Sequence, residues 1–382
     1  MILGIDAFNI RGSGCLTHLY EVLSVIDPSA HGFEKVVIWG NSATLEKLHD
    51  RPWLHKIHVS LLDRPLPYRL FWHRFISKTS AQQAGCSLLF VPGGSDANGF
   101  YPIVTMSQNM LPFEWREIGR YRSPLAILRL LLIRWTQMIS FRNANGVIFL
   151  TKYASKSIIQ CTGKLRGESV IIPHGINRRF YLKPRPQSMR SQNGLGYPWR
   201  ILYVSAIYTY KHQWNVVEAV AALRSEGFSI KLELIGPSGD GINLLNDALN
   251  RFDPQGDFIS YYGAVAYEIL ADYYSRADIG VFASSCENMP NIVVEKMAAG
   301  LPIACSGMGP MPEILGESCV YFNPCNPGDI AAAIRKLILS PSLRRECADS
   351  GFERAKLLSW ERCANETFEF LGRIAKHGTK NL

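Results

Sequence analysis

The sequence predicts an α/β protein of two domains, each built on a parallel β-sheet. Short apolar runs typical of buried strands alternate with helical or irregular connections, the pattern of a parallel sheet with helices on both faces. A chain of 382 residues is long for one hydrophobic core. A stretch at 183–198, rich in Pro, Gly, Ser, Gln and Asn, has linker composition and is the expected domain boundary.

The expected strands divide around that linker, and binding loops in such folds lie at the carboxyl ends of the strands. The first domain is expected to hold strands at 2–6, 35–39, 57–61, 87–91, 103–106 and 146–150, with a last strand and exit turn in 170–176. The second is expected to hold strands at 200–205, 231–235, 259–262, 279–283, 302–305 and 319–322, followed by helices at 329–339, 341–357 and 359–376.

Composition excludes several classes of protein. Hydrophobic residues make up 47% of the chain and charged residues 19%, which describes an ordered globular protein. Nine cysteines without a C-x-x-C pair argue against a disulfide framework and a zinc site, and they suit a reducing compartment. The opening residues Met1–Asp6 resemble a strand and lack the basic start of a signal peptide. We therefore expect a cytoplasmic protein.

The positive charge is concentrated in one half of the chain. Residues 1–185 carry a net charge of +12 and residues 186–382 a net charge of −3. Segments 64–78 and 115–142 combine Arg with Trp, Phe and Leu, which fits amphipathic helices lying on an anionic membrane. The alternative is core helices whose arginines reach solvent. Arginines interrupt the second segment short of a membrane span. Nucleic acid is a less favoured partner, since no recognisable binding module is present.

The most informative motif lies at 286–302. Glu287 precedes and Glu295 lies within a helix expected from about Pro290 to Ala299, which Gly300 and Pro302 close. Backbone N–H groups around 289–292 have no intrahelical partner and can bind an anion such as a diphosphate. The alternative is a βα unit with two solvated glutamates.

Loops of the first domain add weaker signals. The small-residue loop Arg11–Gly14 lies between a strand and a helix expected from about Leu16, where backbone amides can approach a phosphate or sugar. Thr17 excludes the dinucleotide fingerprint, so a simple tight turn is the alternative. His18 is expected to be packed or solvated. Loops 92–96 and 107–114 carry polar groups able to bond a sugar.

Taken together, an ordered set of motifs resembles glycosyltransferase family 4, also called group 1, whose members use nucleotide sugars and have the GT-B architecture. In the second half the motifs are Leu234–Pro237, Tyr262–Val265, Ala277–Asp278, Ala283–Glu287, Glu295–Pro302, Met311–Ile314, Phe322–Pro324 and Leu358–Trp360. In the first half they are Gly146–Thr151 and Val170–Gly175.

The resemblance implies two Rossmann-like domains facing each other across a cleft. Domain 1–183 is then the acceptor side, domain 199–363 binds the nucleotide sugar, and helix 364–382 crosses back to the first domain. It also implies that Lys211 neutralises the diphosphate, that Glu287 meets donor-sugar hydroxyls and that Glu295 binds the ribose. Lys211 and Glu287 are the expected catalytic residues. The full donor set is Gly12, Ser13, Gly14, Ser205, Lys211, Gly236, Val265, Glu287, Asn288, Met289, Pro290, Asn291, Ile292 and Glu295.

Two positions depart from the family pattern. Ala206 stands where members usually have an arginine that partners the lysine, so Lys211 acts with the helix N-terminus, or another cation such as Arg11 compensates. The histidine common near the start of the 107–109 loop is absent, which leaves acceptor contacts to Ser107, Gln108 or Asn109.

The predicted function is a retaining, metal-independent transfer of a hexose-type sugar, with no cofactor, to a saccharide or lipid-linked saccharide. Cell-surface polysaccharide synthesis, lipopolysaccharide included, at the inner face of the membrane is the expected setting. The sequence contains no D-x-D motif, which is consistent with catalysis without a metal. Another GT-B sugar enzyme, such as a nucleotide-sugar epimerase or a phosphorylase, and a non-catalytic glycosyltransferase-like subunit are the alternatives.

Overall fold

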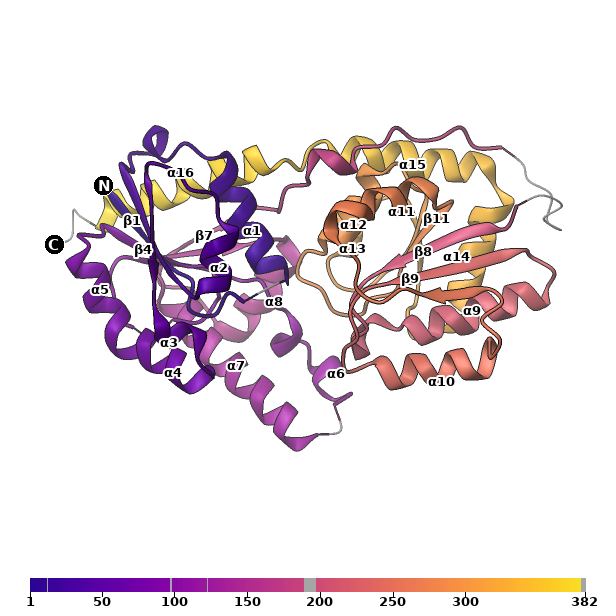
Figure 1. Ribbon diagram of the computed structural model, residues 1–382, viewed down its shortest axis with the longest axis horizontal. Coiled ribbons are helices and arrows are strands. Elements are labelled where there is room, and N and C mark those ends of the chain that lie inside the picture. Colours follow the sequence, from indigo (N-terminus) through magenta and orange to yellow (C-terminus); the bar gives the residue numbers. More distant parts are fainter. Residues whose placement is uncertain (12, 97, 122, 189–196, 379–382) are drawn as a thin grey trace. The chain divides into compact units, whose positions relative to one another are not determined.

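The computed structural model describes residues 1–11, 13–96, 98–121, 123–188 and 197–378. It divides into two compact units (Figure 1). Unit 1 consists of Met1–Gly175 with Ser359–Leu382, and unit 2 consists of Ile176–Leu358. Each unit contains one parallel sheet covered by helices, so the expected α/β class with two Rossmann-like sheets is confirmed.

Unit 1 has a seven-stranded sheet in the order β3-β2-β1-β4-β5-β6-β7. The chain fills one side of β1 first and then crosses to the other, so the strand order reverses between β1 and β4. That reversal is the topological switch point, where ligands bind in open α/β sheets. The strands are β1 Ile2–Asp6, β2 Lys35–Gly40, β3 Leu54–His58, β4 Leu88–Val91, β5 Ile103–Met106, β6 Gly146–Phe149 and β7 Glu168–Ile171.

The helices of unit 1 include a π-helical segment in a connection that leads to β4. The bounds expected for the strand at 57–61 are wrong. The strand β3 pairs with β2 from Leu54 to His58, and a helix begins at Ser60. The helices are α1 Ser13–Val25, α2 Ser42–Lys47, α3 Ser60–Asp63, α4 Leu66–Phe71, the π-helix Trp72–Ile76, α5 Ser77–Gln83, α6 Trp115–Ile118, α7 Pro124–Asn143, α8 Lys152–Thr162 and α16 Trp360–Gly378.

Unit 2 has a six-stranded sheet in the order β10-β9-β8-β11-β12-β13, with its switch point between β8 and β11. The strands are β8 Trp199–Val204, β9 Ile230–Ile235, β10 Ile259–Tyr261, β11 Ile279–Phe282, β12 Ile303–Ser306 and β13 Cys319–Phe322. The helices are α9 Gln213–Ser225, α10 Ile242–Phe252, α11 Leu270–Arg276, α12 Asn291–Ala298, α13 Met311–Leu315, α14 Pro327–Leu339 and α15 Pro341–Ala355.

The units divide at residues 175/176 and 358/359, whereas the linker composition and the resemblance place the boundaries at 183/199 and 363/364. The first eight residues after Gly175 belong to unit 2, because Phe180 is fully buried against Tyr267 and Tyr274. The Leu182 N–H also donates to the Ala298 carbonyl at 3.0 Å. Composition marks where a chain lacks regular structure, and packing decides which unit a segment joins.

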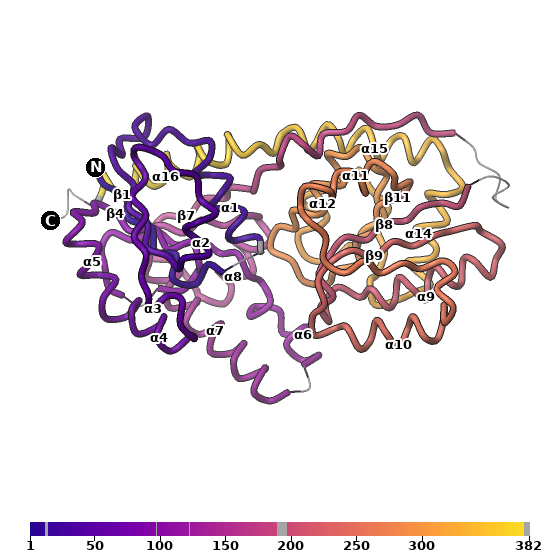
Figure 2. The backbone as a smooth tube through the Cα atoms, viewed as in Figure 1, coloured from indigo at the N-terminus to yellow at the C-terminus, as the bar shows by residue number. Residues whose placement is uncertain are grey.

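The chain returns to unit 1 through α16, which packs along α1 (Figure 2). Its inward face includes Cys363, Phe368 and Leu371, all buried. Gly146 on β6 accommodates this helix, since a Cβ there would lie 2.8 Å from the Phe370 ring. The last helix is therefore part of the unit 1 core.

Candidate functional site

The switch point of unit 2 brings Lys211 and Glu287 together. Lys211 ends the loop after β8, and Glu287 lies in the loop after β11. Their side chains form an ion pair between Nζ and Oε1, and both are largely buried, with 8% and 13% of the side chains exposed. Two of the sequence-predicted residues, 76 positions apart in the chain, thus form a single site.

Hydrogen bonds between the two loops hold this pair in place. The Tyr210 carbonyl accepts from the Ser285 N–H at 2.9 Å, and the Tyr203 hydroxyl donates to the Lys211 carbonyl. His212 adopts φ 51°, a left-handed conformation uncommon outside glycine, and its Nε2 lies 2.9 Å from Ser285 Oγ. Sequence reasoning missed His212 and Ser285, because nothing in their types marks this backbone geometry.

Glu295 lies on the first turns of α12 and is 3% exposed. Tyr274 donates to its Oε2 at 2.7 Å, and Tyr267 donates to its Oε1 at 3.4 Å. Burial raises the pKa of Glu295, while the tyrosine hydrogen bonds and the charge of Lys296 oppose the shift. A carboxylate has about four lone-pair sites, so this one retains capacity to accept further hydroxyl donors.

The N-terminus of α12 begins at Asn291, with Pro290 as its N-cap and without a side-chain cap. Its first N–H groups point out of the helix at the carboxyl edge of the sheet, and the helix dipole favours an anion there. Asn288, Met289 and Pro290 are buried beside Glu287, while Asn291 and Ile292 are partly exposed. An anion bound at this end of α12 is therefore also within the reach of the loop that carries Glu287.

The remaining donor-side predictions in unit 2 lie around the same edge. The Ser205 N–H donates to the Ile235 carbonyl at 2.7 Å, which ties the end of β8 to β9. Gly236 has φ 147°, and a Cβ there would lie 2.0 Å from the Ser205 carbonyl oxygen, so only glycine fits. Val265 is half-buried in the loop that follows β10.

Lys296, the residue after Glu295, has no exposed surface, and its Nζ has no hydrogen-bond partner. The ammonium lies 5.5 Å from the Phe282 ring centroid, and Lys211 Nζ lies 5.0 Å from the same ring. Burial lowers the pKa of Lys296 to about 7, against the opposing charge of Glu295. Sequence reasoning missed this second lysine, because its type predicts a solvent-exposed side chain.

The other predicted residues belong to unit 1, and their contacts lie within that unit. Gly12 lies outside the described residues. Ser13 and Gly14 belong to the first turn of α1, so the helix begins three residues before the expected Leu16. Arg11 donates to the carbonyls of Leu62 and Arg64 at 2.6 and 2.8 Å. The Arg11 guanidinium is therefore hydrogen-bonded to backbone carbonyls of its own unit.

The three candidate acceptor residues follow β5. Ser107 is buried, and its N–H donates to the Ile148 carbonyl at 2.9 Å. Gln108 is half-buried and donates to the Pro92 carbonyl at 3.3 Å, while Asn109 is exposed. The loops after β4 and β5 are therefore joined at the carboxyl edge of this sheet.

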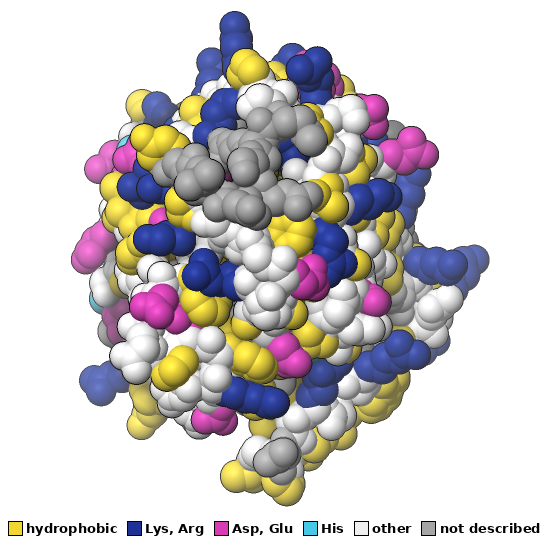
Figure 3. Space-filling view, turned by 90° about the vertical axis from the view of Figure 1, so that its right-hand side faces the viewer, with side chains coloured by type: hydrophobic (Ala, Val, Ile, Leu, Met, Phe, Trp, Pro, Cys, Tyr) yellow, Lys and Arg dark blue, Asp and Glu magenta, His cyan; other side chains and the backbone are white. Residues whose placement is uncertain are grey.

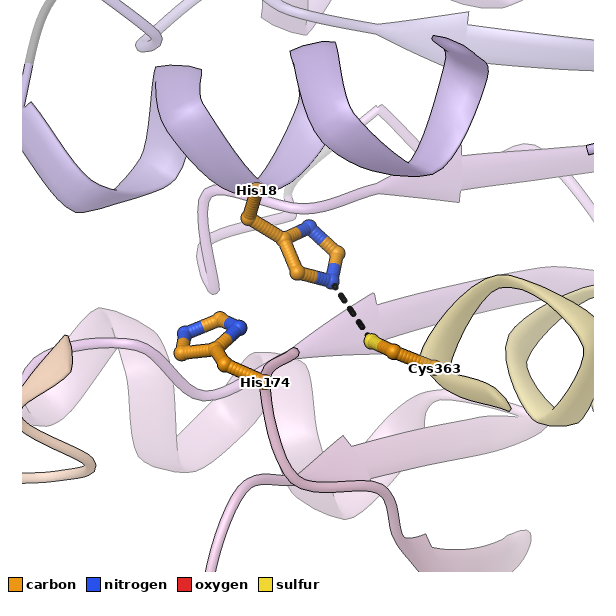
Figure 4. Close-up of side chains that lie close together, drawn as sticks. All are labelled: His18, His174 and Cys363. Atoms are coloured by element: carbon orange, nitrogen blue, oxygen red, sulfur yellow. Dashed lines mark hydrogen bonds between the residues drawn. The ribbon is translucent and has the colours of Figure 1, made fainter. Parts of the chain in front are cut away.

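One group of potential metal ligands occurs among the described residues (Figure 4). It consists of His18, His174 and Cys363, whose ligand atoms lie within 4.8 Å of one another. Burial lowers the pKa of His18 to about 4, so the ring is neutral. Trp360 packs on both imidazoles, at ring distances of 5.9 and 5.7 Å. The cluster joins α1, the exit from β7 and α16, and His18 is packed as expected.

The basic segments form helices with exposed apolar side chains. Among the described residues, α7 alone has the length and hydropathy that crossing a bilayer requires, with a mean hydropathy of 1.2 and 22% of that window buried. Arg134 is partly exposed, and its guanidinium donates to the Pro112 carbonyl at 3.1 Å and lies 4.4 Å from the Trp115 ring. On the face shown in Figure 3, basic, acidic and apolar side chains are interspersed.

Comparison with known proteins shows similarity to glycosyltransferases. Residues 198–340 match the model of "Glycosyl transferases group 1". The chain is 27% identical over 239 residues to a D-inositol 3-phosphate glycosyltransferase of Nocardiopsis dassonvillei, covering 60% of this chain and 56% of that one. It is 28% identical over 167 residues to the O-antigen chain mannosyltransferase B of Escherichia coli, covering 44% of each. The chain thus spans about half the length of these relatives.

Solved structures agree on the fold. Sucrose-phosphate synthase of Thermosynechococcus elongatus superposes with a TM-score of 0.77 at 18% identity, covering 100% of both chains. Alr3699/HepE of Anabaena, solved with UDP and glucose, has a TM-score of 0.71 at 16% identity, covering 97% of this chain and 98% of that one.

Proposed function

We propose that the protein transfers a hexose-type sugar from a nucleoside-diphosphate donor to a saccharide or lipid-linked saccharide, with retention of configuration. The match of residues 198–340 to the group 1 glycosyltransferase model and the GT-B fold support this proposal. The observation that carries the proposal is the Lys211–Glu287 pair at the switch point of unit 2, beside the N-terminus of α12. The similarity to HepE, solved with UDP and glucose, supports the donor class.

The chemical demand is to stabilise a departing diphosphate. Transfer breaks the bond between sugar C1 and the diphosphate oxygen and forms a bond from C1 to the acceptor oxygen, while the acceptor proton passes to the diphosphate. Lys211, released from Glu287 when the donor binds, neutralises the diphosphate together with the α12 amides. The freed Glu287 accepts hydrogen bonds from donor-sugar hydroxyls, and Glu295 accepts them from the ribose.

We also propose that this step uses no metal, since Lys211 and the amides of α12 supply the positive charge. Lys296 Nζ lies inside unit 2, on the Phe282 ring that Lys211 also contacts. Because burial lowers the pKa of Lys296 to about 7, this lysine is only partly charged near neutral pH and adds a fraction of the charge that Ala206 does not provide.

The outer face of α7 supports a membrane location. Residues at spacings of three and four along this helix form an exposed apolar stripe, while its opposite face packs on unit 1. A stripe of this kind beside exposed arginines fits the interface of an anionic bilayer. We therefore propose a lipid-linked acceptor at the cytoplasmic membrane face, in cell-surface polysaccharide synthesis. The stripe consists of Leu125, Leu128, Leu132, Trp135 and Ile139.

A thermal-shift screen of UDP-, GDP- and dTDP-sugars tests the donor assignment. A ligand at 100 times its Kd stabilises the chain by about 2.7 kcal/mol. Radiolabel passing to a lipid extract of the source cells supports transfer, and conversion of the free nucleotide sugar supports an epimerase. Absence of binding to every nucleotide sugar and free nucleoside diphosphate favours a non-catalytic subunit.

Sedimentation with liposomes tests the membrane assignment. Anionic vesicles are expected to recover more protein than neutral ones, and Leu128→Asp with Trp135→Asp is expected to reduce that recovery. Leu357→Asp is the control, because Leu357 in unit 2 is a leucine at least as exposed (67%) as Leu128 (54%). Equal recovery with both lipids contradicts the electrostatic part of the assignment.

A further inference from the structure

The switch point of unit 1 holds a buried network that the function above does not use. Asp6 is the last residue of β1, and its carboxylate is buried. His73 donates from Nδ1 to Asp6 Oδ2 at 2.7 Å, and the Ser77 hydroxyl donates to the same oxygen at 2.8 Å. On the other side of the imidazole, Nε2 lies 3.5 Å from Asp96 Oδ1. Asp96 follows β4, so the two aspartates lie on either side of the switch point.

A π-helical turn and a stacked aromatic ring hold the His73 side chain in this position. It lies in the π-helical segment Trp72–Ile76, and π-helical turns are rare and occur often at functional sites. Phe8 stacks on the imidazole at 4.0 Å with an interplanar angle of 13°. Burial lowers the pKa of His73, but the carboxylates of Asp6 and Asp96 outweigh it and raise the pKa overall. The carboxylates on either side of the ring thus favour its charged form.

Exposure increases along the network toward Asp96. The side chains of Asp6 and His73 are 0% and 3% exposed, whereas 15% of the Asp96 side chain remains exposed. Asp96 is therefore the member of the network that a ligand can reach. The His73 imidazole lies behind this carboxylate, and a carboxylate offers only acceptor sites to a ligand.

The Asp96 loop is also fixed to the helix that carries the apolar stripe. The Ser140 hydroxyl accepts from the Asp96 N–H at 2.8 Å and donates to the Asp96 carbonyl at 2.9 Å. Ser140 lies on the packed face of α7. The carboxylate at the switch point is thus anchored directly to the element proposed to lie on the membrane.

We propose that Asp96 binds a hydroxyl group of the acceptor saccharide at the switch point of unit 1, with His73 and Asp6 as positioning residues. This inference rests on the proposed function, since it names the acceptor side of the same transfer. A carboxylate suits a polyhydroxylated ligand, because hydroxyl groups are donors and an ionised carboxylate offers several acceptor sites. The ligand class is a saccharide with a free hydroxyl at the growing end.

The test measures transfer of radiolabel from UDP-, GDP- and dTDP-sugars to a lipid extract of the source cells, at varied extract concentration. A lost hydrogen bond to a charged group predicts that Asp96→Asn lowers kcat/KM for the extract by roughly 10- to 100-fold. The Kd of the nucleoside diphosphate is expected to stay within about twofold. Asp96→Ser is a second variant of the same loop position. His73→Gln is expected to raise KM for the extract more than it lowers kcat.

Asp63→Asn is the matched control, because Asp63 pairs with His58 at 2.5 Å elsewhere on unit 1 and should leave transfer unchanged. If the Asp96 variants transfer like wild type, the inference is overturned and the proposed function stands. If they lose donor binding as well, Asp96 supports the fold and the inference also fails. If wild type transfers no label, the proposed function fails, and the acceptor assignment fails with it.

Discussion

At the switch point of the first sheet two aspartates lie on either side of a histidine, whereas at the second a lysine faces a glutamate. The strand order reverses in the same way in both sheets. Similar topology therefore presents two different chemistries: hydrogen-bond acceptors in unit 1 and a cation with backbone amides in unit 2. The first arrangement suits hydroxyl donors and the second suits a diphosphate. The comparison teaches that the fold provides the position and the loop side chains decide the ligand.

The largest effect is expected at the cation of unit 2. Lys211→Ala should lower turnover by about a hundredfold or more, because loss of one preorganised electrostatic donor costs roughly 3 to 4 kcal/mol. Steady-state assays of nucleoside-diphosphate release measure it. Lys231→Ala, an exposed lysine on β9, is the control. Unchanged turnover in the Lys211 variant removes that residue from the mechanism and breaks the comparison.

Two buried histidines of unit 1, His18 and His73, should affect the free energy of unfolding in opposite ways as the pH changes. The lowered pKa of His18, about 4, means that its contribution to stability is present above pH 6.5 and is lost as the pH falls toward 4. For a fully buried group this shift corresponds to about 3 kcal/mol. His18→Gln should flatten the acid side of a plot of unfolding free energy against pH.

His73 should act in the other direction. Its pKa is raised in the folded state, so its stabilising contribution is complete below the unfolded value of 6.5 and is lost as the pH rises through the folded value. His73→Gln should therefore flatten the same plot above pH 6.5. Denaturant titrations across the pH range measure both variants. A flattened acid side in the His73 variant would contradict a charged imidazole at the switch point.

A smaller effect is expected at Glu295. Glu295→Gln should weaken nucleoside-diphosphate binding by about tenfold, because an amide with a single acceptor oxygen replaces a carboxyl group with two oxygens for the ribose hydroxyls. Isothermal titration calorimetry measures the Kd. Tyr274→Phe is the control for the hydroxyl that donates to Glu295 at 2.7 Å. Intact affinity in the glutamine variant argues against contact with the ribose.

The smallest effect is expected at the loop that holds Lys211. Ser285→Ala removes hydroxyl contacts to His212 Nε2 and the Tyr210 carbonyl, at 2.9 and 3.3 Å. Loss of one neutral hydrogen bond costs about 1 kcal/mol, so turnover should fall by roughly fivefold. Ser275→Ala on α11 is the control, since that hydroxyl bonds only within its own helix turn. A hundredfold loss in Ser285→Ala gives that hydroxyl a role beyond positioning.

Sequence alone determined the class of fold and much of the unit 2 site. The apolar runs 103–106 and 319–322 identified strands to the residue. The first is buried on both faces, where a strand has little choice of side chain. Proline at the start and glycine after the end marked α12 for the same local reason. The spacing of Glu287 and Glu295 depends on one loop and one helix, so it could be recognised without the rest of the chain.

Only the tertiary structure decided which distant residues meet. Asp6, His73 and Asp96 lie in three separate segments, and no local pattern relates them until β1 and β4 pair. The same holds for His18, His174 and Cys363, and for the complete burial of Lys296 on α12. Local propensity and spacing act over a few residues, whereas a buried polar network is fixed by strand order and by the desolvation that packing imposes. The segment of unit 2 that carries Glu287 and Glu295 could therefore be predicted from local sequence, and the acidic switch point of unit 1 could not.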